Sequence, residues 1–302
     1  MHQDIKKIPR RSALYSPGAN PRAMEKIGGI AADVFILDLE DAVAPDCKLA
    51  AREHVAAFLR KRKHDGREVI VRVNGLDTPW CNDDINAVID LRPDGILFPK
   101  VSSAQDVQRA EQMLTAAGAR EFLQLWCMIE TPRSILNLAA IAQEANEQGS
   151  RMSVWVMGTN DLVKDLHASH TVERAPLLYA LSAALNAARA YGLGILDGVH
   201  NDIADLGALA IACEQGRAMG FDGKTIIHPS QVDYCNRIFA PDPQAVISAR
   251  RIIEAFDQPE NAGKGVLQVD GKMVELMHAE IARDTIAISD AIASLAQKNL
   301  NS

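Results

Sequence analysis

Eight short apolar runs alternate with stretches of helical periodicity along most of this 302-residue chain, and this alternation restricts the possible folds more than any other feature. The runs are Ala13–Tyr15, Val34–Leu39, Val69–Val73, Gly95–Pro99, Gln124–Ile129, Ser153–Met157, Gly194–Leu196 and Lys224–Ile227. Helical patterns that end at glycines occupy residues 48–63, 102–118, 133–148, 176–191 and 205–219. Eight strand–helix units predict a TIM (β/α)8 barrel, with a doubly wound open sheet as the alternative.

The chain changes character after Phe239, where APDPQ places two prolines close together and marks a boundary. A helix over about 243–256, a Gly-rich turn, a hairpin-like VLQVDGKMV and a helix over about 275–298 are expected beyond it. We therefore predict a catalytic barrel over residues 1–240 and a C-terminal helical and hairpin extension over residues 241–302.

Composition excludes several classes of partner. The net charge of -7 is spread along the chain without a basic block, which argues against nucleic acid and anionic membranes. The first residues contain no apolar signal-like core, and no run of about 18 apolar residues occurs. The five cysteines are widely spaced and include no CxxC pair, as expected for reduced thiols. We expect a cytoplasmic protein.

Polar side chains follow almost every predicted strand. Asp38, Glu40 and Asp41 come directly after the run VFIL, although a charged loop capping the next helix is an alternative reading of these acids. Other strand ends carry Arg72, Asn74, Lys100, Glu130, Asn160, Asp161, Asp197 and His228. Because the carboxyl ends of parallel strands form the active-site face of a barrel, we expect these side chains to share one site.

Glu130 and Asp161 are the best pair of metal ligands among these strand-end residues. Each follows a hydrophobic strand and precedes a polar or glycine-containing turn. Acids predominate and no cluster of Cys or His accompanies them, so hard oxygen ligands and Mg2+ are expected rather than Zn2+.

Seven ordered segments make the chain resemble the citrate lyase beta-subunit-like family of the HpcH/HpaI aldolase superfamily, which includes malyl-CoA and citramalyl-CoA lyases. The segments are RRSALYSPGANPRAMEK, VFILDLEDAVAPDCKLAAR, VIVRVNG, GILFPKV, MIETPRS, MGTNDLV and FDGKTIIHPSQV. The resemblance is close over about residues 10–240 and looser in the tail. It implies a Mg2+-dependent TIM barrel that acts on short 3-hydroxyacyl-CoA thioesters, usually as a homotrimer.

The resemblance also implies roles for individual residues. It places the metal ligands at Glu130 and Asp161 and the substrate arginine at Arg72. It places the contacts to the CoA moiety at Tyr15, Arg22, Lys26, Ile227 and His228.

The tail departs from the family pattern at one position. Family members usually carry an Asp followed by Met-Pro near DGKM, and that Asp reaches the active site of a neighbouring subunit as an acid/base. Here Glu275 replaces the Asp and Met277 replaces the Pro. The extra methylene of Glu275 moves the carboxylate by about 1.5 Å, a displacement large enough to change catalysis.

These observations predict a carbon–carbon lyase that splits a malyl-, citramalyl- or citryl-CoA-like thioester into acetyl-CoA and an α-oxo acid. Mg2+ polarises the substrate, Arg72 stabilises negative charge on oxygen, and Glu275 transfers a proton. One alternative is a thioesterase or condensing enzyme on the same scaffold. Another is a CoA-ester-binding subunit without turnover. The motifs leave the acyl group, the stereochemistry and the physiological direction open.

Overall fold

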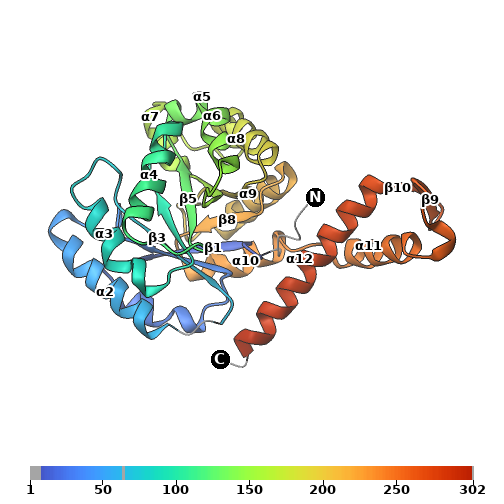
Figure 1. Ribbon diagram of the computed structural model, residues 1–302, viewed down its shortest axis with the longest axis horizontal. Coiled ribbons are helices and arrows are strands. Elements are labelled where there is room, and N and C mark those ends of the chain that lie inside the picture. Colours follow the sequence, from blue (N-terminus) through green and yellow to red (C-terminus); the bar gives the residue numbers. More distant parts are fainter. Residues whose placement is uncertain (1–7, 63–64, 301–302) are drawn as a thin grey trace. The chain divides into compact units, whose positions relative to one another are not determined.

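In a computed structural model, which describes residues 8–62 and 65–300, eight parallel strands form a closed barrel in sequence order (Figure 1). They are β1 (Ser12–Pro17), β2 (Val34–Asp38), β3 (Glu68–Arg72), β4 (Gly95–Phe98), β5 (Gln124–Ile129), β6 (Met152–Met157), β7 (Gly194–Asp197) and β8 (Gly223–Ile226). Each predicted run overlaps one of these strands. β1 pairs with β8 through Ser12 and Lys224, so the sheet has no free edge. The predicted TIM barrel is confirmed, and the open doubly wound sheet is excluded.

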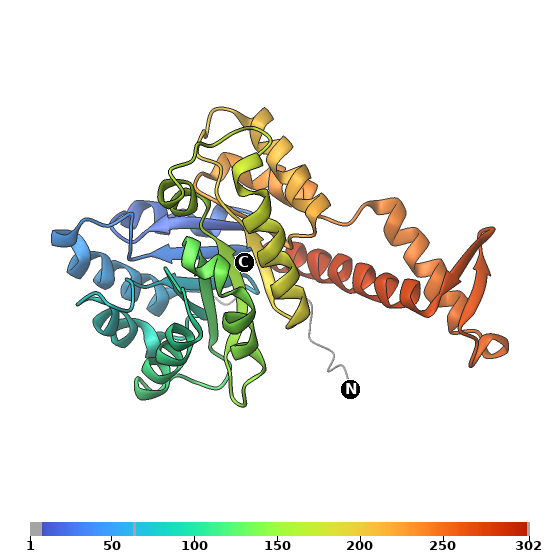
Figure 2. The ribbon, with the colours of Figure 1, turned by 90° about the horizontal axis from the view of Figure 1, so that it is seen from above.

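Helices surround the strands in both views (Figures 1 and 2). They are α1 (Pro21–Glu25), α2 (Lys48–Lys61), α3 (Cys81–Val88), α4 (Ala104–Ala116), α5 (Pro132–Leu136), α6 (Leu138–Gln143), α7 (Thr159–Asp165), α8 (Leu178–Ala190), α9 (Leu206–Met219) and α10 (Val232–Ile238). The helix predicted over 133–148 is broken, because Asn137 takes a non-helical conformation between α5 and α6. Periodicity alone does not reveal such a local break.

The core has two layers, as the alternation of side chains along each strand requires. Ile36, Ile70, Trp126, Val156 and Leu196 belong to the cluster inside the barrel. The neighbouring strand residues, such as Ile195 and Ile226, belong to a larger cluster with the helices. This alternation decides which strand-end side chains face the barrel axis and which face the helices.

A polar network fills the barrel at the amino ends of its strands. Arg10 Nε donates to Glu68 Oε2 at 2.6 Å, and its guanidinium lies 5.3 Å from the ring centroid of Trp126. Trp126 Nε1 donates to Gln124 Oε1 at 3.0 Å. The backbone of Arg10 also passes so close to Gly223 that a Cβ atom there would lie 1.9 Å from the Arg10 carbonyl oxygen.

Residues Arg10–Phe239 form one compact unit, the barrel unit, and residues from Ala240 onward belong to a second, the C-terminal unit. The C-terminal unit contains α11 (Pro243–Phe256), an antiparallel hairpin of β9 (Val266–Val269) and β10 (Lys272–Glu275), and α12 (Leu276–Leu300). These elements match the helix, hairpin and helix expected from the sequence. That this unit covers the active site of a neighbouring subunit stays a prediction.

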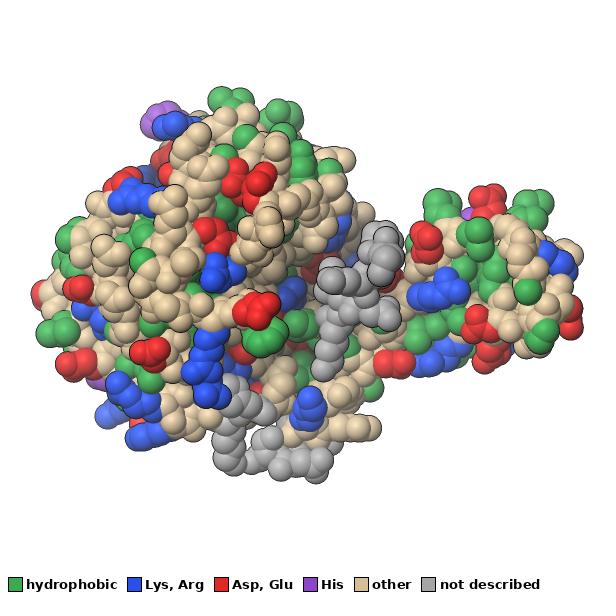
Figure 3. Space-filling view, in the orientation of Figure 1, with side chains coloured by type: hydrophobic (Ala, Val, Ile, Leu, Met, Phe, Trp, Pro, Cys, Tyr) green, Lys and Arg blue, Asp and Glu red, His purple; other side chains and the backbone are tan. Residues whose placement is uncertain are grey.

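The surface carries acidic and basic side chains interspersed over the face shown in Figure 3. Several large apolar side chains of the C-terminal unit are exposed, namely Ile247, Val266, Met273, Leu276, Met277 and Ile281. Within the described ranges, every helix is too short or too polar to span a membrane. All five cysteines are free thiols, and only Cys47 is exposed.

The contact between Gly223 and Arg10 makes barrel closure sensitive to one methyl group. We expect Gly223→Ala to lower the free energy of unfolding by about 1–3 kcal/mol or more, because the backbone cannot move away without breaking β1–β8 pairing. Gly28→Ala is the control, since a Cβ at Gly28 meets no described atom within 4 Å. Trp80, Trp126 and Trp155 all lie in the barrel unit, so denaturant titration followed by tryptophan fluorescence reports on this unit alone. Equal midpoints for the two variants would contradict the argument.

Candidate active site

Arg72 and Asp38 form a buried, bidentate ion pair at the carboxyl ends of β3 and β2. Arg72 shares the inward face of its strand with Ile70, so the guanidinium points into the barrel mouth. Its Nε and Nη2 atoms donate to the two carboxylate oxygens of Asp38, each at 2.7 Å. Burial alone raises the pKa of Asp38, but the charge and hydrogen bonds of Arg72 outweigh it and hold this pKa below its ordinary value. Asp38 therefore fixes Arg72 in one orientation.

Tyr15 completes the surroundings of Arg72. The guanidinium lies over the Tyr15 ring, 4.9 Å from its centroid. Burial raises the pKa of the Tyr15 phenol well above its ordinary value, so the hydroxyl stays protonated. Tyr15 was predicted to contact CoA, and here its ring packs inside the barrel mouth against the predicted substrate arginine.

Glu40 and Lys100 link the Arg72 pair to the predicted metal ligands. Glu40 Oε2 lies 3.0 Å from Arg72 Nη1, and Glu40 Oε1 lies 3.3 Å from Lys100 Nζ. Burial raises the pKa of Glu40. Lys100 adopts a left-handed backbone conformation with φ of 56°, and its N–H donates to Glu130 Oε1 at 2.7 Å. One lysine thus contacts two carboxylates, Glu40 through its side chain and Glu130 through its backbone.

Glu130 is buried directly after β5 with only 1% of its surface exposed. Burial raises the pKa of Glu130 to about 8, and the negative charges of Glu40 and Asp161 add to this shift. Gly158 leaves the space that the side chain occupies, since a Cβ at this position would lie 2.2 Å from Glu130 Oε2. Asp161 lies in the first turn of α7, and its side chain is 22% exposed.

The donor set fits Mg2+. Carboxylates whose charges disfavour one another are stabilised by a divalent cation, and Glu130 Oε1 is held in place by the Lys100 backbone. Across the described residues, no three His, Cys, Asp or Glu side chains form a ready-made metal cluster. Mg2+ suits this arrangement, because it commonly binds through one or two carboxylates and keeps several waters or substrate oxygens.

The remaining predicted CoA contacts lie on the surface of the barrel unit. Arg22 and Lys26 are exposed on and just after α1. Ile227 follows β8 and is 41% exposed. His228 is exposed next to it, and its Nδ1 lies 2.7 Å from Ser230 Oγ and accepts from the Ser230 N–H. Their part in CoA binding stays a prediction.

Glu275 is the last residue of β10 in the C-terminal unit, and its side chain is exposed. Its backbone N–H donates to His278 Nδ1 at 3.0 Å, which joins the end of the hairpin to the first turn of α12. The catalytic role predicted for Glu275 requires this unit to meet a barrel mouth, and it stays a prediction.

Asp197 does not join the residues around Arg72, contrary to the expectation that all strand-end side chains share one site. It follows Leu196, which faces the barrel interior, so its own side chain faces the helices. There it accepts from Lys224 Nζ at 2.9 Å and from Arg174 Nη1 at 2.7 Å. Sequence reasoning missed this buried ion cluster, because Arg174 lies in a loop and the motif around Lys224 gives no sign of its partners.

Comparisons with known proteins give a consistent family. The family model described as HpcH/HpaI aldolase/citrate lyase matches residues 11–229. The chain is 46% identical over 286 residues to a (3S)-malyl-CoA thioesterase of Cereibacter sphaeroides, covering 95% of this chain and 96% of that protein. It is 29% identical to the mitochondrial citramalyl-CoA lyase of Homo sapiens, covering 95% and 87%.

A solved structure extends the likeness to the fold as a whole. Protein CitE from Mycobacterium tuberculosis, in complex with magnesium, acetoacetate and coenzyme A, has a TM-score of 0.71 and 28% sequence identity. The match covers 93% of this chain and 99% of that one.

The raised pKa of Glu130 predicts how the stability of the metal-free protein varies with pH. Between the ordinary pKa of 4.5 and the folded value of about 8, the folded state binds more protons than the unfolded state, so stability falls as pH rises. Glu130→Gln removes this loss, and we expect the variant to be more stable than the parent at pH 8, by on the order of a few kcal/mol, and similar at pH 5.

Denaturant titration in EDTA at several pH values measures the difference. Glu121→Gln, which changes an exposed carboxylate, is the control and should leave the pH profile unchanged. A Glu130→Gln profile parallel to that of the parent would show that burial does not disfavour the charged carboxylate.

Proposed function

The chain belongs to the HpcH/HpaI aldolase/citrate lyase family, and we propose that it hydrolyses a short 3-hydroxyacyl-CoA thioester of the malyl-CoA type with Mg2+ held by Glu130 and Asp161. The observation that carries this proposal is the 46% identity with a (3S)-malyl-CoA thioesterase over nearly the whole of both chains. Identity with the citramalyl-CoA lyase is 29%. Sequence analysis favoured carbon–carbon cleavage, with a thioesterase as an alternative. Because identity with the thioesterase is higher than identity with the lyase, we now prefer the thioesterase.

The site supplies what both reactions need at the substrate acyl group. Glu130 and Asp161 would hold Mg2+, which when bound would supply Lewis-acid polarisation of substrate oxygens. Arg72 offers positive charge to an oxygen that becomes negative, and Asp38 holds it in place before substrate arrives. Such fixed donors cost no reorganisation during the reaction.

Hydrolysis adds water to the thioester carbonyl and expels CoA as a thiolate, which leaves the hydroxy acid intact. A base must take a proton from that water, and we assign this role to Glu275 of the C-terminal unit. Its longer side chain in place of the usual Asp changes the reach of the carboxylate, which suits attack at a different atom.

Carbon–carbon cleavage is the second candidate. It is supported by the similarity to the citramalyl-CoA lyase and by the same acidic pair and arginine. In this reaction the 3-hydroxyl loses a proton, the C2–C3 bond breaks, and an α-oxo acid leaves the acetyl-CoA enolate. The two candidates differ in product, so one assay distinguishes them.

A panel of malyl-CoA, citramalyl-CoA and citryl-CoA, incubated with Mg2+, provides that assay. We expect release of free CoA without an α-oxo acid, followed with a thiol reagent and a carbonyl reagent in parallel. EDTA or Asp161→Ala should abolish turnover while the cooperative fluorescence transition persists, because an acid that is 22% exposed at a strand end contributes little to the core. Release of one α-oxo acid per substrate consumed would show that the activity is that of a lyase and not of a thioesterase. Binding without either product would indicate a subunit that only binds CoA esters.

The role of Glu275 has its own test. We expect Glu275→Gln to lower kcat at least about tenfold, toward the lower end of general acid–base effects, without changing the oligomeric state. Glu280→Gln, an exposed glutamate in the first turns of α12, is the matched control. Glu275→Asp restores the residue usual in the lyases, so a gain in oxo-acid release would link side-chain length to the outcome of the reaction. Unchanged kcat in Glu275→Gln would remove this residue from the mechanism.

A further inference from the structure

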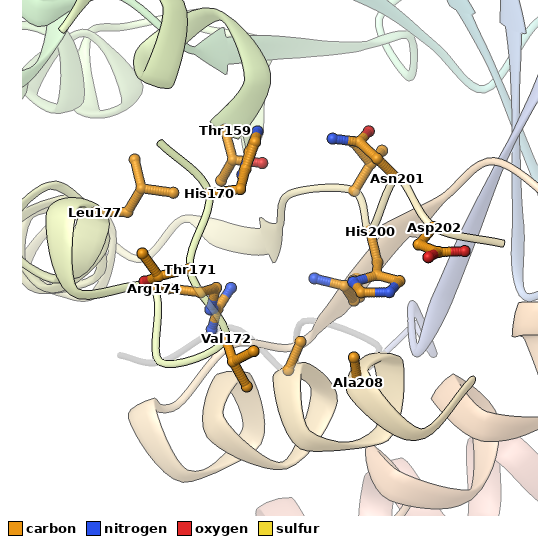
Figure 4. Close-up of a pocket in the computed structure, with 13 residues that line it drawn as sticks. Thr159, His170, Thr171, Val172, Arg174, Leu177, His200, Asn201, Asp202 and Ala208 are labelled. Carbon is orange, nitrogen blue, oxygen red and sulfur yellow. The ribbon is translucent and has the colours of Figure 1, made fainter. Parts of the chain in front are cut away.

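A cavity of about 320 Å3 lies in the barrel unit, apart from the residues around Arg72. Figure 4 shows two loops on its opposite sides, one with His170 to Arg174 and the other with His200 to Asp202, and Ala208 of α9 below them. Lys224 lines the same cavity. Because Lys224 alternates with Thr225 and shares its strand face with Ile226 in the outer core layer, the cavity lies on the helix side of the strands.

Arg174 is the central group of this cavity. Its Nη1 donates to both oxygens of Asp197 at 2.7 Å, and its Nε donates to Gln215 Oε1 at 2.5 Å. The residue is only 9% exposed, and its Nη2 atom is buried without a hydrogen-bond partner in the part of the chain that the structure describes. The backbone of Arg174 takes a left-handed conformation with φ of 54°, which is costly for a non-glycine residue.

Two further polar atoms of the lining share this property. Thr159 Oγ1 and His200 Nε2 are buried and lack a hydrogen-bond partner among the described residues. Leaving such an atom unpaired is unfavourable, and a guanidinium N–H costs more than a neutral group. The three residues that carry these unpaired atoms line one cavity, which favours a polar occupant that accepts a hydrogen bond from Arg174.

The charged residues that line the deep part of the cavity determine which sign of charge the occupant should carry. Arg174 and Lys224 are two cations that share one carboxylate, Asp197. Burial lowers the pKa of His200, and the charge of Lys224 lowers it further, which favours the neutral imidazole. Asp202 lies at the exposed edge, where its Oδ1 accepts from the N–H groups of Ala204 and Asp205. The deep part of the cavity carries a net positive charge and suits an anion.

Much of the remaining lining is apolar, beside the polar residues His170, Thr171 and Asn201. Val172, Leu177, Val199, Ala208 and Ala212 all contribute to it. Inorganic phosphate would leave this surface without contacts, whereas a short carbon chain would cover it.

We propose that this cavity binds a short carboxylate that bears a hydroxyl or oxo group. The carboxylate pairs with Arg174 Nη2, the substituent meets Thr159 Oγ1 and His200 Nε2, and the carbon chain packs on the apolar lining. This is a second acid-binding site, separate from the one around Arg72 and Glu130, and it does not depend on the reaction proposed above.

Calorimetric titration of metal-free protein in EDTA with lactate, propionate and inorganic phosphate tests the proposal. We expect lactate to bind more tightly than propionate, which lacks the hydroxyl, and phosphate to bind most weakly. Ala208→Leu should weaken lactate binding at least about tenfold, because the larger side chain fills the cavity, a loss of about 1.4 kcal/mol. Ala218→Leu, an exposed alanine on the same helix, and Glu130→Gln in the other site should leave binding unchanged.

His200→Phe provides a second variant in case Ala208→Leu fails to unfold cooperatively. It removes Nε2 but not Arg174, so it should reduce the preference for lactate over propionate while propionate binding persists. The proposal is overturned if wild-type protein binds no acid below about 10 mM, a negligible affinity. It is also overturned if phosphate binds best, if Glu130→Gln abolishes binding, or if His200→Phe leaves the preference unchanged.

Discussion

The burial of Glu130 beside other carboxylates at one end of the barrel is the constraint around which the site is organised. Burial raises the pKa of Glu130, and the negative charges of Glu40 and Asp161, which come from other strand ends, raise it further. Arg72 and Lys100 offset part of this repulsion through Glu40. The proposed metal ion would offset the excess negative charge near Glu130, so affinity for the cation and the cost of the metal-free site would have the same physical origin.

The two ends of the barrel differ in how well their polar groups are paired. At the amino ends, Arg10, Glu68 and Gln124 satisfy one another in a closed polar network beneath Trp126. At the carboxyl ends, burial and neighbouring negative charges disfavour the charged form of Glu130. The network below can stabilise the barrel while the site above remains costly to maintain, which is the usual division in this fold.

Much of the fold follows from local pattern, and less of the site does. Every strand was predictable because a buried strand in a barrel is an apolar run between turns, and Glu130 and Asp161 were identifiable as acids after such runs. The placement of Asp197 was wrong, since strand-end position does not tell which face a side chain takes; one residue of register decides it. The partners of Arg174 depend on how a long loop folds back over β7, and no local pattern encodes that contact.

The pairing of β1 with β8 joins the first and last strands of the barrel unit, so nearly the whole unit must be present before the sheet can close. Such distant contacts make folding slow and leave strand edges open in the meantime. The C-terminal unit follows β8 in the chain, and its elements are therefore synthesised after the closing strand. A nascent chain can thus complete its barrel while its last helices are still being made, which shortens the time that open edges are exposed to other chains.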